Sequence, residues 1–541
     1  MRLAKFITPA LAALVAAGCA ADELEIGPED VTKPGDGKWD SSVEAVFVDM
    51  EFDAVLFTTS SWNPRQTIQD QMLYTIGHLN GERSVGRLDR LTLTDIQTRS
   101  VAGGVEISYH ARLPVAWGRR QSVPSTYTFT LPRDVSFSGL DSFTEKYMHS
   151  CVDWGAHDVD AGSMWYYYRP ERSGFSMDAA DVVEVTAAVS VSSINTTGKY
   201  PEYHKVWEDD VLEVVAIFGK YEDFATSNGD AGIAAYNEFI GSMKDELRPL
   251  GATTIPADIP FNPGVELPDI TFSAELPDGK RIQIVALLVD NVRTPPAGFD
   301  QRYAALSQTA DVIAYNGHAG LGANIRALAR KGSWVPGQYV IVFMNGCDTY
   351  AYVDGALAEA HAAVNPDDPN GTKYMDIVTN AMPAFFHETA NSTRAIVRAL
   401  MQPEQPITYE KIFTSIDRSQ VVLVSGEQDN EFVPGGGGGG EGEENWGGLE
   451  RAGIVARNQE IRAATPVLAP GTYRFEIEGT SDADLYVRVG EEPTVSLYDC
   501  RPYRAGSSEV CEVDLGAPAV IHVMVRGWAS SSSFTLTGSK L

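Results

Sequence analysis

Residues 310–352 read ADVIAYNGHAGLGANIRALARKGSWVPGQYVIVFMNGCDTYAY, and their pattern predicts the arrangement of strands in the middle of the chain. It holds two short apolar runs, DVIAYNGH and QYVIVFMNGC, each bounded by Gly or Pro. Runs this short that are rich in β-branched and aromatic residues favour buried strands. The segment between them, Gly322 to Lys331, has the length of a crossover helix. A crossover helix predicts two parallel neighbouring strands whose carboxyl ends share one edge of a sheet.

Each run ends in a side chain that can carry chemistry. The first ends at Asn316-Gly317-His318 and the second at Asn345-Gly346-Cys347. Open α/β sheets place their ligands at the carboxyl edge, so His318 and Cys347 are predicted to lie side by side there. A cysteine beside a histidine at such an edge is typical of a nucleophile and its general base. In the alternative interpretation, Cys347 is a buried core thiol and His318 an ordinary loop residue.

Length and charge limit the classes of protein to consider. At 541 residues the chain is too long for one core, and roughly three to four domains are expected at about 150 residues each. The net charge is −31, from 73 acidic and 42 basic residues. This balance argues against nucleic acid or an anionic membrane as a binding surface, and its plain interpretation is solubility.

Residues 1–19, MRLAKFITPALAALVAAGC, have the pattern of a secretory signal peptide, with a charged start, an apolar centre and small residues before Cys19. The stretch resembles a bacterial lipoprotein signal, although Ala16 stands where such signals usually carry Leu. The resemblance implies that Cys19 is lipidated and that the protein is exported, with the outer membrane as the expected location. The membrane would then be contacted only through the lipid. Alternatively, Cys19 belongs to an ordinary signal peptide and the protein is secreted.

An oxidising compartment sets the interpretation of the remaining cysteines. Cys500 and Cys511 lie eleven apart in a β-rich tail and are predicted to form a disulfide. Cys151 and Cys347 are left, and they could pair with each other. If they do not, at least one of them is a thiol in an exported protein, which calls for a function.

Composition and periodicity divide the mature chain into several parts. Residues 20–42 are predicted to be a disordered acidic spacer, and residues 434–452 a Gly-rich linker. Residues 43–205 are predicted to form an α+β domain of unknown role. Residues 210–433 alternate strands and helices, which predicts an α/β domain with a mostly parallel sheet. Within it, a long helical stretch is expected from Met375 to Met401.

One segment of the α+β domain carries residue types that can ligate zinc. These candidates are His149, Cys151, His157, Asp158 and Asp160. Their spacings match no tight ligand pattern, so the favoured interpretation is an acidic loop beside core aromatics. No metal and no cofactor are expected.

Residues 453–541 alternate apolar and polar positions with Gly at the turns, which predicts an all-β sandwich. This tail resembles the bacterial pre-peptidase C-terminal domain. The resembling residues are Pro470-Gly471-Thr472, Asp482 to Arg488, Cys500-Arg501-Pro502-Tyr503 with Cys511, and Val525-Arg526-Gly527. The resemblance implies a non-catalytic domain attached to an exported hydrolase.

The α/β domain resembles the caspase–gingipain–legumain clan of cysteine peptidases. The resembling residues are Gly317-His318-Ala319-Gly320 and Asn345-Gly346-Cys347, each at the end of an apolar strand. The resemblance implies a caspase-like fold in which Cys347 is the nucleophile and His318 the general acid and base. It also implies an oxyanion hole made by the backbone N–H groups of Cys347 and of Ala319 or Gly320. The clan usually has Gly where this chain has Ala319.

Other residues near the strand ends are candidates for supporting roles. Asn316 or Asn345 could orient the imidazole, or could simply serve the turns. The acidic residues that could select a basic substrate side chain are Glu222, Asp223, Asp290 and Asp348, although each is also an ordinary loop residue.

Two hypotheses of different class follow. In the first, the protein is an exported cysteine endopeptidase that hydrolyses peptide bonds of a protein or peptide through a thioester. In the second, it is a non-catalytic surface lipoprotein that binds protein or glycan. The sequence also leaves room for an inhibitory or positioning role of residues 43–205. The oligomeric state is not predicted.

Overall fold

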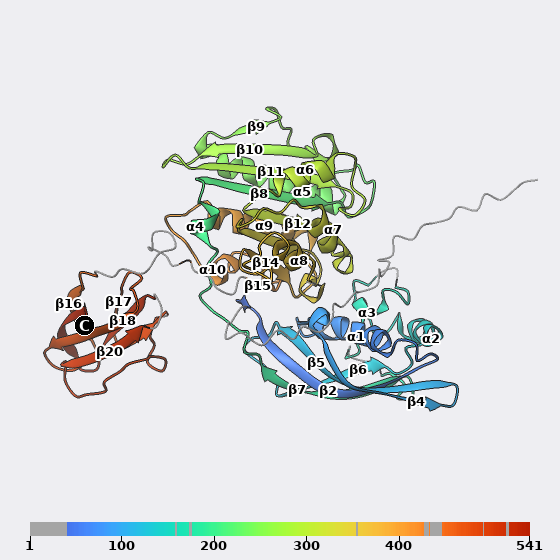
Figure 1. Cartoon of the computed structure of the whole chain (residues 1–541), viewed down its shortest axis with the longest axis horizontal. Helices are drawn as coiled ribbons and strands as arrows, with labels where there is room; N and C mark the ends of the chain where they lie inside the picture. Colours follow the sequence, from blue (N-terminus) through green and yellow to red (C-terminus); the bar gives the residue numbers. More distant parts are fainter. Residues whose placement is uncertain are drawn as a thin grey trace, which may run out of the picture. The chain divides into compact units, whose positions relative to one another are not determined.

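The computed structural model describes residues 40–156, 159–171, 176–352, 355–426, 432, 446–490, 492–515 and 519–541. These residues divide into two compact units (Figure 1). The first, which we call the body, holds residues up to 199, residues 209–402 and residues from 409 to 429. The second, which we call the tail, holds the rest, including the β-rich C-terminal region. The predicted domains 43–205 and 210–433 therefore lie largely within one unit.

The N-terminal domain of the body is an antiparallel sheet in the order β3-β5-β2-β7-β6, with β4 paired to β5. Helices α1 and α2 cover one face of this sheet (Figure 1). The elements are β2 (Val46–Thr58), α1 (Pro64–Asn80), β3 (Val85–Gly86), β4 (Thr92–Val101), β5 (Gly104–Trp117), β6 (Thr126–Pro132), α2 (Phe137–Tyr147), α3 (Met164–Tyr167) and β7 (Val182–Val191).

Local sequence explains where α1 begins. The Asn63 side chain accepts a hydrogen bond from the N–H of Gln66, and Pro64 occupies the first turn. An Asn cap followed by Pro is a common start because it satisfies a free N–H and fixes φ near its helical value. The helix continues through Gly77 to Asn80, and this places Asn80 at the boundary with the second domain.

The second domain of the body is an α/β domain. Within the described residues its sheet has nine strands in the order β1-β15-β14-β13-β12-β8-β11-β10-β9. The strands are β1 (Ser41–Ser42), β8 (Val211–Gly219), β9 (Thr253–Ile255), β10 (Asp269–Glu275), β11 (Arg281–Val289), β12 (Val312–Asn316), β13 (Val340–Asn345), β14 (Met375–Asn380) and β15 (Val422–Gly426). The strands from β11 to β14 in this order are parallel, and both margins are antiparallel. The sheet is therefore mixed rather than mostly parallel.

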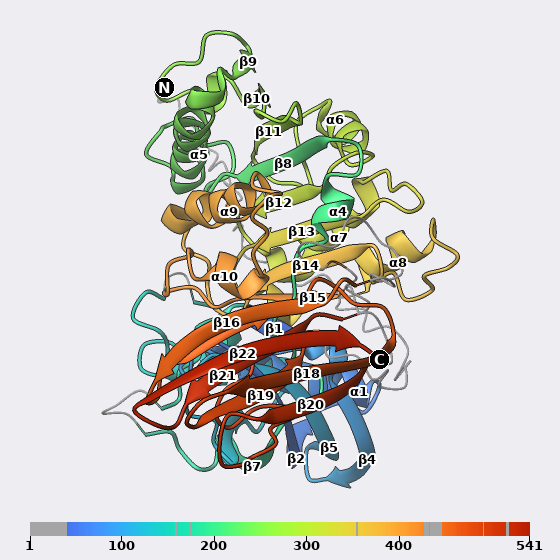
Figure 2. The ribbon, with the colours of Figure 1, turned by 90° about the vertical axis from the view of Figure 1, so that its left-hand side faces the viewer.

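Helices cover both faces of this sheet (Figure 2). Helix α9 packs on α5 and on strands β8, β12 and β13, while α7 packs on α6 and α8 against the other face. The helices are α5 (Ala231–Leu247), α6 (Phe299–Leu306), α7 (Ala323–Lys331), α8 (Ala356–Ala362), α9 (Phe386–Leu400) and α10 (Tyr409–Phe413). Helix α7 is the predicted crossover between β12 and β13, and those two strands are parallel neighbours as predicted.

The predicted helix from Met375 to Met401 is wrong in its first part. Met375–Asn380 is strand β14, and the helix α9 begins at Phe386. The strand lies between β13 and β15 and is buried on both faces. Its sequence contains Asp376, so it lacks the continuous apolar run that is typical of a buried strand. Asp376 is neutralised by Lys199 at 2.6 Å and accepts the hydroxyl of Tyr339 at 2.6 Å.

The first described residues belong to the α/β sheet. Ser41 and Ser42 form β1, which pairs antiparallel with β15. Residues 40–42 of the predicted spacer therefore belong to this domain, and residues 20–39 of it lie outside the described residues. The N-terminal domain is thus inserted between strand β1 and the rest of the α/β domain.

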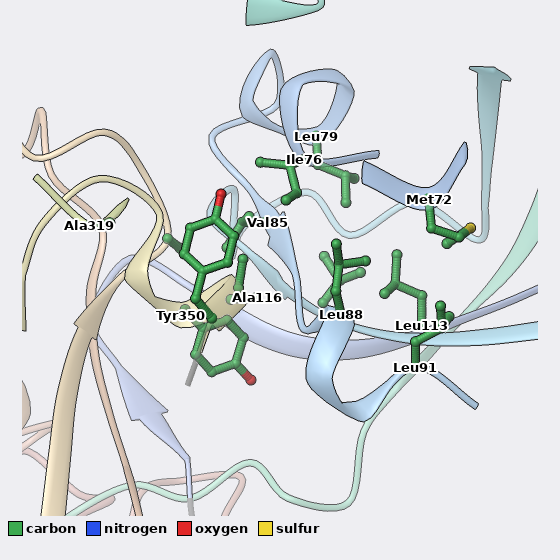
Figure 3. Close-up of a cluster of buried hydrophobic side chains, with 14 of the residues drawn as sticks. Met72, Ile76, Leu79, Val85, Leu88, Leu91, Leu113, Ala116, Ala319 and Tyr350 are labelled. Carbon is green, nitrogen blue, oxygen red and sulfur yellow. The ribbon is translucent and has the colours of Figure 1, made fainter. Parts of the chain in front are cut away.

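One hydrophobic cluster runs through both domains of the body. Tyr350, in the η5 turn (Thr349–Tyr352) after β13, lies among Val85 and Ala116 of the N-terminal domain (Figure 3). Its hydroxyl donates to the buried Asp40 at 3.1 Å. Interfaces that are large and apolar hold domains in fixed positions, whereas small polar ones allow them to move.

The tail is a two-layer β structure, in agreement with the predicted sandwich. One sheet has the order β16-β22-β18-β20 and the other β17-β21-β19. The strands are β16 (Leu449–Ala456), β17 (Glu460–Ala464), β18 (Gly471–Gly479), β19 (Ala483–Val489), β20 (Glu509–Leu515), β21 (Ile521–Gly527) and β22 (Ser531–Lys540). Strand β16 begins within the stretch predicted to be a linker. The predicted disulfide between Cys500 and Cys511 is present.

We predict that the two units unfold in separate calorimetric transitions, while both domains of the body unfold together. Replacing Tyr350 by Ala should lower the free energy of unfolding of the body alone, by about 3–5 kcal/mol, because the substitution leaves a cavity in the core that the two domains share. Replacing Cys500 and Cys511 together by Ser should lower the free energy of unfolding of the tail alone, by about 3 kcal/mol, because the disulfide is lost. Differential scanning calorimetry measures both effects. Separate transitions for residues 40–199 and the α/β domain would contradict the shared core.

Candidate functional site

The carboxyl edge of the parallel strands brings the predicted pair to neighbouring positions. Asn316 of β12 and Asn345 of β13 are aligned in the sheet, so His318 and Cys347 each follow two residues beyond a paired position. Gly346 lies against the other loop, since a Cβ at this position would come within 2.8 Å of the Gly317 oxygen. The two loops are therefore in direct contact, and a larger residue at position 346 would force them apart.

The imidazole of His318 is held by the end of a third strand. Its Nε2 lies 3.0 Å from the carbonyl oxygen of Tyr221, two residues beyond β8. A carbonyl only accepts, so Nε2 carries the hydrogen and Nδ1 keeps a lone pair. The rings of Tyr221 and Phe386 flank the imidazole, with centroids 5.2 Å from it in each case. His318 itself remains exposed.

The backbone around the histidine is fixed as well. The Tyr315 hydroxyl donates to the carbonyl oxygen of His318 at 3.0 Å, and the Asn324 amide donates to the same oxygen. Among the described residues, the N–H groups of Ala319 and Gly320 donate to no acceptor. Such N–H groups at a strand end can bind a developing negative charge.

The hydrogen bonds described for the two asparagine side chains go to groups other than the His318 ring. Asn345 donates to Asn316 at 2.8 Å and accepts from Asn380 at 2.9 Å, which makes an amide ladder across β12, β13 and β14. Thr393 of α9 also donates to Asn316 at 2.8 Å. The ladder ties the strand ends to the helix layer. The backbone carbonyl of Tyr221, rather than either asparagine, is the group that orients the imidazole.

Cys347 is partly buried, and its Sγ lies 3.8 Å from the carbonyl oxygen of Ala384. Cys151 is buried in the N-terminal domain, and its Sγ lies 3.5 Å from the Tyr147 oxygen. Neither cysteine takes part in a disulfide. The alternative pairing of Cys151 with Cys347 is therefore wrong.

Asp348 is buried at the boundary between the two domains. It has a positive φ of 51°, and Asn80 of α1 donates to its Oδ1 at 2.8 Å. Burial raises the pKa of this carboxyl to about 7, against the smaller opposing effects of Asn80, Arg169 and Tyr166. Asp348 is enclosed and cannot reach a substrate side chain.

The other acidic candidates lie in loops around the same edge. Asp290 pairs with Lys220 at 2.7 Å and accepts the N–H of Phe224 at 3.0 Å. Glu222 and Asp223 are exposed beside Tyr221. Of the four, only these last two are available to a substrate from solvent.

The candidate zinc ligands of the N-terminal domain form no metal site among the described residues. His157 and Asp158 lie outside the described residues. Within the part that is described, no group of three or more His, Cys, Asp or Glu side chains is arranged to hold a metal ion. Cys19 likewise lies outside the described residues. Among the described helices, none is both long enough and apolar enough to cross a membrane.

Residues 467–527 match a family model described as the bacterial pre-peptidase C-terminal domain. Residues 467–527 form a domain of that family. Over 58 residues it is 50% identical to a zinc metalloprotease of Helicobacter pylori, covering 11% of this chain and 23% of that protein. Over 58 residues it is also 50% identical to the hemagglutinin/proteinase of Vibrio cholerae, covering 11% of this chain and 10% of that protein. The solution structure titled vEP C-ter 100 is 34% identical, with a TM-score of 0.15, covering 18% of this chain and 96% of that one.

These similarities are confined to the pre-peptidase domain. The chain spans a quarter or less of the length of the curated relatives named above. The two curated relatives are named as proteases, and the similarity to them says nothing about the body of this chain.

The sequence missed three contributors to the site for different reasons. Tyr221 follows the end of β8, the strand beside β12, so the strand order would have pointed to it. Asn380 was missed because β14 was read as helix. Asn80 of α1, which donates to Asp348 at 2.8 Å, has no signal in the sequence because it comes from the other domain.

We predict that stability of the body decreases between pH 4 and pH 8 because of Asp348. Its folded pKa of about 7 lies above the ordinary value of 3.8, so the folded state binds the proton more tightly. Its contribution is fully present below pH 3.8 and is lost as the pH rises through 7. Replacing Asp348 by Asn should leave the melting temperature near its original value at pH 4 and raise it by at least about 3 °C at pH 8. An equal shift at both pH values would contradict this origin.

Proposed function

We propose that the protein is an exported cysteine endopeptidase in which Cys347 is the nucleophile and His318 the general base and acid. The alignment of Asn316 with Asn345 on adjacent parallel strands carries this proposal, because it brings the two loops together at one edge. The order of the parallel strands and the antiparallel β15 are further support for a caspase-like domain. The pre-peptidase domain of the tail supports a link to proteolysis.

The imidazole supplies the base. Because the Nε2 hydrogen of His318 is directed to Tyr221, Nδ1 is the nitrogen that accepts the proton of the Cys347 thiol. The thiolate then attacks the peptide carbonyl carbon, forming the C–S bond while the carbonyl electron pair moves to oxygen. The N–H group of Cys347 and that of Ala319 or Gly320 are the donors proposed for this oxyanion. Ala at position 319 serves as well as Gly here, since only its backbone N–H is used.

Collapse of the intermediate breaks the C–N bond, and the imidazolium returns its proton to the leaving amine. Water, deprotonated by the same imidazole, then hydrolyses the thioester and restores the thiol. The flanking rings of Tyr221 and Phe386 limit how far the imidazole can rotate between these steps. No metal or cofactor enters this sequence of steps.

Localisation is part of the same proposal. The signal-like segment that ends at Cys19 supports export and attachment to a bacterial membrane through lipid. The competing hypothesis of a non-catalytic binding lipoprotein requires an unreactive Cys347. The reactivity of this thiol therefore distinguishes it from the peptidase hypothesis.

We predict that replacing Cys347 by Ala lowers kcat/KM for peptide hydrolysis by at least about 1,000-fold, because the nucleophile is lost. Replacing His318 by Ala should have an effect of similar size, since the two side chains act together. A fluorogenic peptide library and a thiol-reactive peptide probe provide the two measurements. The matched control is replacement of Cys151 by Ala, because that thiol is buried in the N-terminal domain.

Activity in the Cys347→Ala variant, or probe labelling at another residue, would refute the assignment. Saturable binding of a protein or glycan by a wild-type protein without turnover would favour the competing hypothesis.

A further inference from the structure

The backbone carbonyl of His318 is bound by two buried side chains. The Tyr315 hydroxyl donates to its oxygen at 3.0 Å, and the Asn324 amide donates to the same oxygen. The second N–H of that amide donates to the Tyr315 hydroxyl at 2.9 Å, so the three groups form a closed triangle. Tyr315 and Asn324 are both almost fully buried. Because a satisfied polar network in a buried place is rigid, the carbonyl has one fixed direction.

The hydroxyl of Tyr315 lies against two stretches of bare backbone. A Cβ at Gly317 would come within 2.9 Å of the hydroxyl oxygen, and a Cβ at Gly219 within 3.2 Å. Gly219 is the last residue of β8, and Gly317 directly follows β12. A side chain at position 317 would displace the hydroxyl, so the absence of one is needed for the hydrogen bond to His318.

The peptide unit between His318 and Ala319 is trans, so its direction also fixes an N–H group. A trans peptide is planar, and its N–H points opposite to its C=O. With the carbonyl of His318 directed at Tyr315 and Asn324, the Ala319 N–H is directed away from them. In the described part of the chain this N–H donates to no acceptor.

The nitrogen of Ala319 lies beside the loop of the thiol. A Cβ placed on Gly346 would come within 3.3 Å of this nitrogen, so Gly346 packs against this end of the peptide unit. Gly346 directly precedes Cys347. The N–H that the triangle orients is therefore next to the proposed nucleophile.

The side chain of Ala319 fixes the same residue from another direction. It is buried and belongs to the hydrophobic cluster that also contains Val85 and Tyr350 (Figure 3). A glycine at this position would lose the contact and would leave the backbone freer to rotate. The methyl group is therefore a second fixed point beside the peptide unit.

We propose that Tyr315 and Asn324 are positioning residues that direct the Ala319 N–H at the carbonyl oxygen of the substrate when Cys347 attacks. This inference rests on the proposed function for its catalytic meaning, and it selects Ala319 over Gly320 as an oxyanion donor. As the C–S bond forms, the carbonyl electron pair moves to oxygen, and the Ala319 N–H donates to that oxygen. A donor that is fixed before the reaction stabilises this charge without reorganising. Tyr315 and Asn324 keep their own protons throughout.

The first test compares catalysis with the reactivity of the thiol. Replacing Tyr315 by Phe keeps the ring and removes the hydroxyl, so the His318 carbonyl keeps only its bond to Asn324. We expect kcat for a fluorogenic peptide to fall about tenfold while KM stays within about twofold, because the N–H acts on the charged intermediate. Iodoacetamide forms no oxyanion, so the rate at which it alkylates Cys347 should not change. Mass spectrometry of the whole protein measures that rate.

The matched control is Tyr236→Phe. Tyr236 of α5 is also buried, and its hydroxyl also donates to a backbone carbonyl, that of Leu267, at 2.6 Å. This variant loses an equivalent hydrogen bond elsewhere in the α/β domain and should keep the wild-type kcat. Equal losses of kcat in the two Phe variants would overturn the proposal, because they would indicate a general effect on stability. An unchanged kcat in Tyr315→Phe, or alkylation slowed as much as kcat, would overturn it too.

A second measurement does not depend on catalysis. The double variant Tyr315→Phe/Asn324→Ala leaves the His318 carbonyl without both donors. We expect its crystal structure, compared with that of the wild-type protein, to show the peptide unit between residues 318 and 319 rotated. An unchanged peptide unit would refute the positioning role. If the double variant does not fold, Asn324→Ala alone removes two bonds of the triangle and should lower kcat about tenfold at constant KM. An unchanged kcat in that variant would also refute the role.

The two proposals fail in distinguishable ways. If the peptide unit rotates as expected but the wild-type protein hydrolyses no peptide, the positioning role stands and the peptidase function falls. If hydrolysis depends on Cys347 while kcat and the peptide unit are indifferent to Tyr315 and Asn324, the peptidase function stands and the positioning role falls.

Discussion

The shared core between the N-terminal domain and the α/β domain is the constraint on which the body depends. Tyr350 occupies the point where the two meet, packed among apolar side chains of the first domain and bonded to Asp40. Arg87 lies over the same ring, with its guanidinium carbon 5.2 Å from the ring centroid. Because Tyr350 follows Cys347 by three residues, the packing that joins the domains also sets the position of the cysteine loop.

A second constraint acts from inside the sheet. The amides of Asn316, Asn345 and Asn380 form a ladder across three buried strand ends. Buried amides are costly unless they are paired, so the ladder permits few alternative alignments of the strands. The alignment of the strands in turn brings the His318 and Cys347 loops into register. The polar residues that looked like turn formers in the sequence are therefore part of the framework of the site.

Much of the α/β domain follows from local pattern. The apolar runs before His318 and Cys347, with a helix-length segment between them, were enough to predict parallel strands and a common edge. The run MDIVTN was harder, because Asp376 and Asn380 interrupt it. Tertiary partners, Lys199 and Tyr339, make the buried carboxylate acceptable. The contact of Asn80 with Asp348 could not be predicted at all. It joins residues 268 positions apart, for which a single sequence has no periodic signal.

Strand β1 has a consequence for how this protein can be divided. The two residues of β1 pair with the outer edge of β15. The N-terminal domain follows β1 in the sequence, and the α/β domain continues at β8. An unpaired strand margin exposes a row of backbone donors and acceptors that other chains can join. A fragment that starts at Val43 would leave β15 uncovered, and a fragment that starts at β8 would also strip the shared core. The α/β domain excised without these segments should therefore aggregate rather than remain a smaller soluble protein.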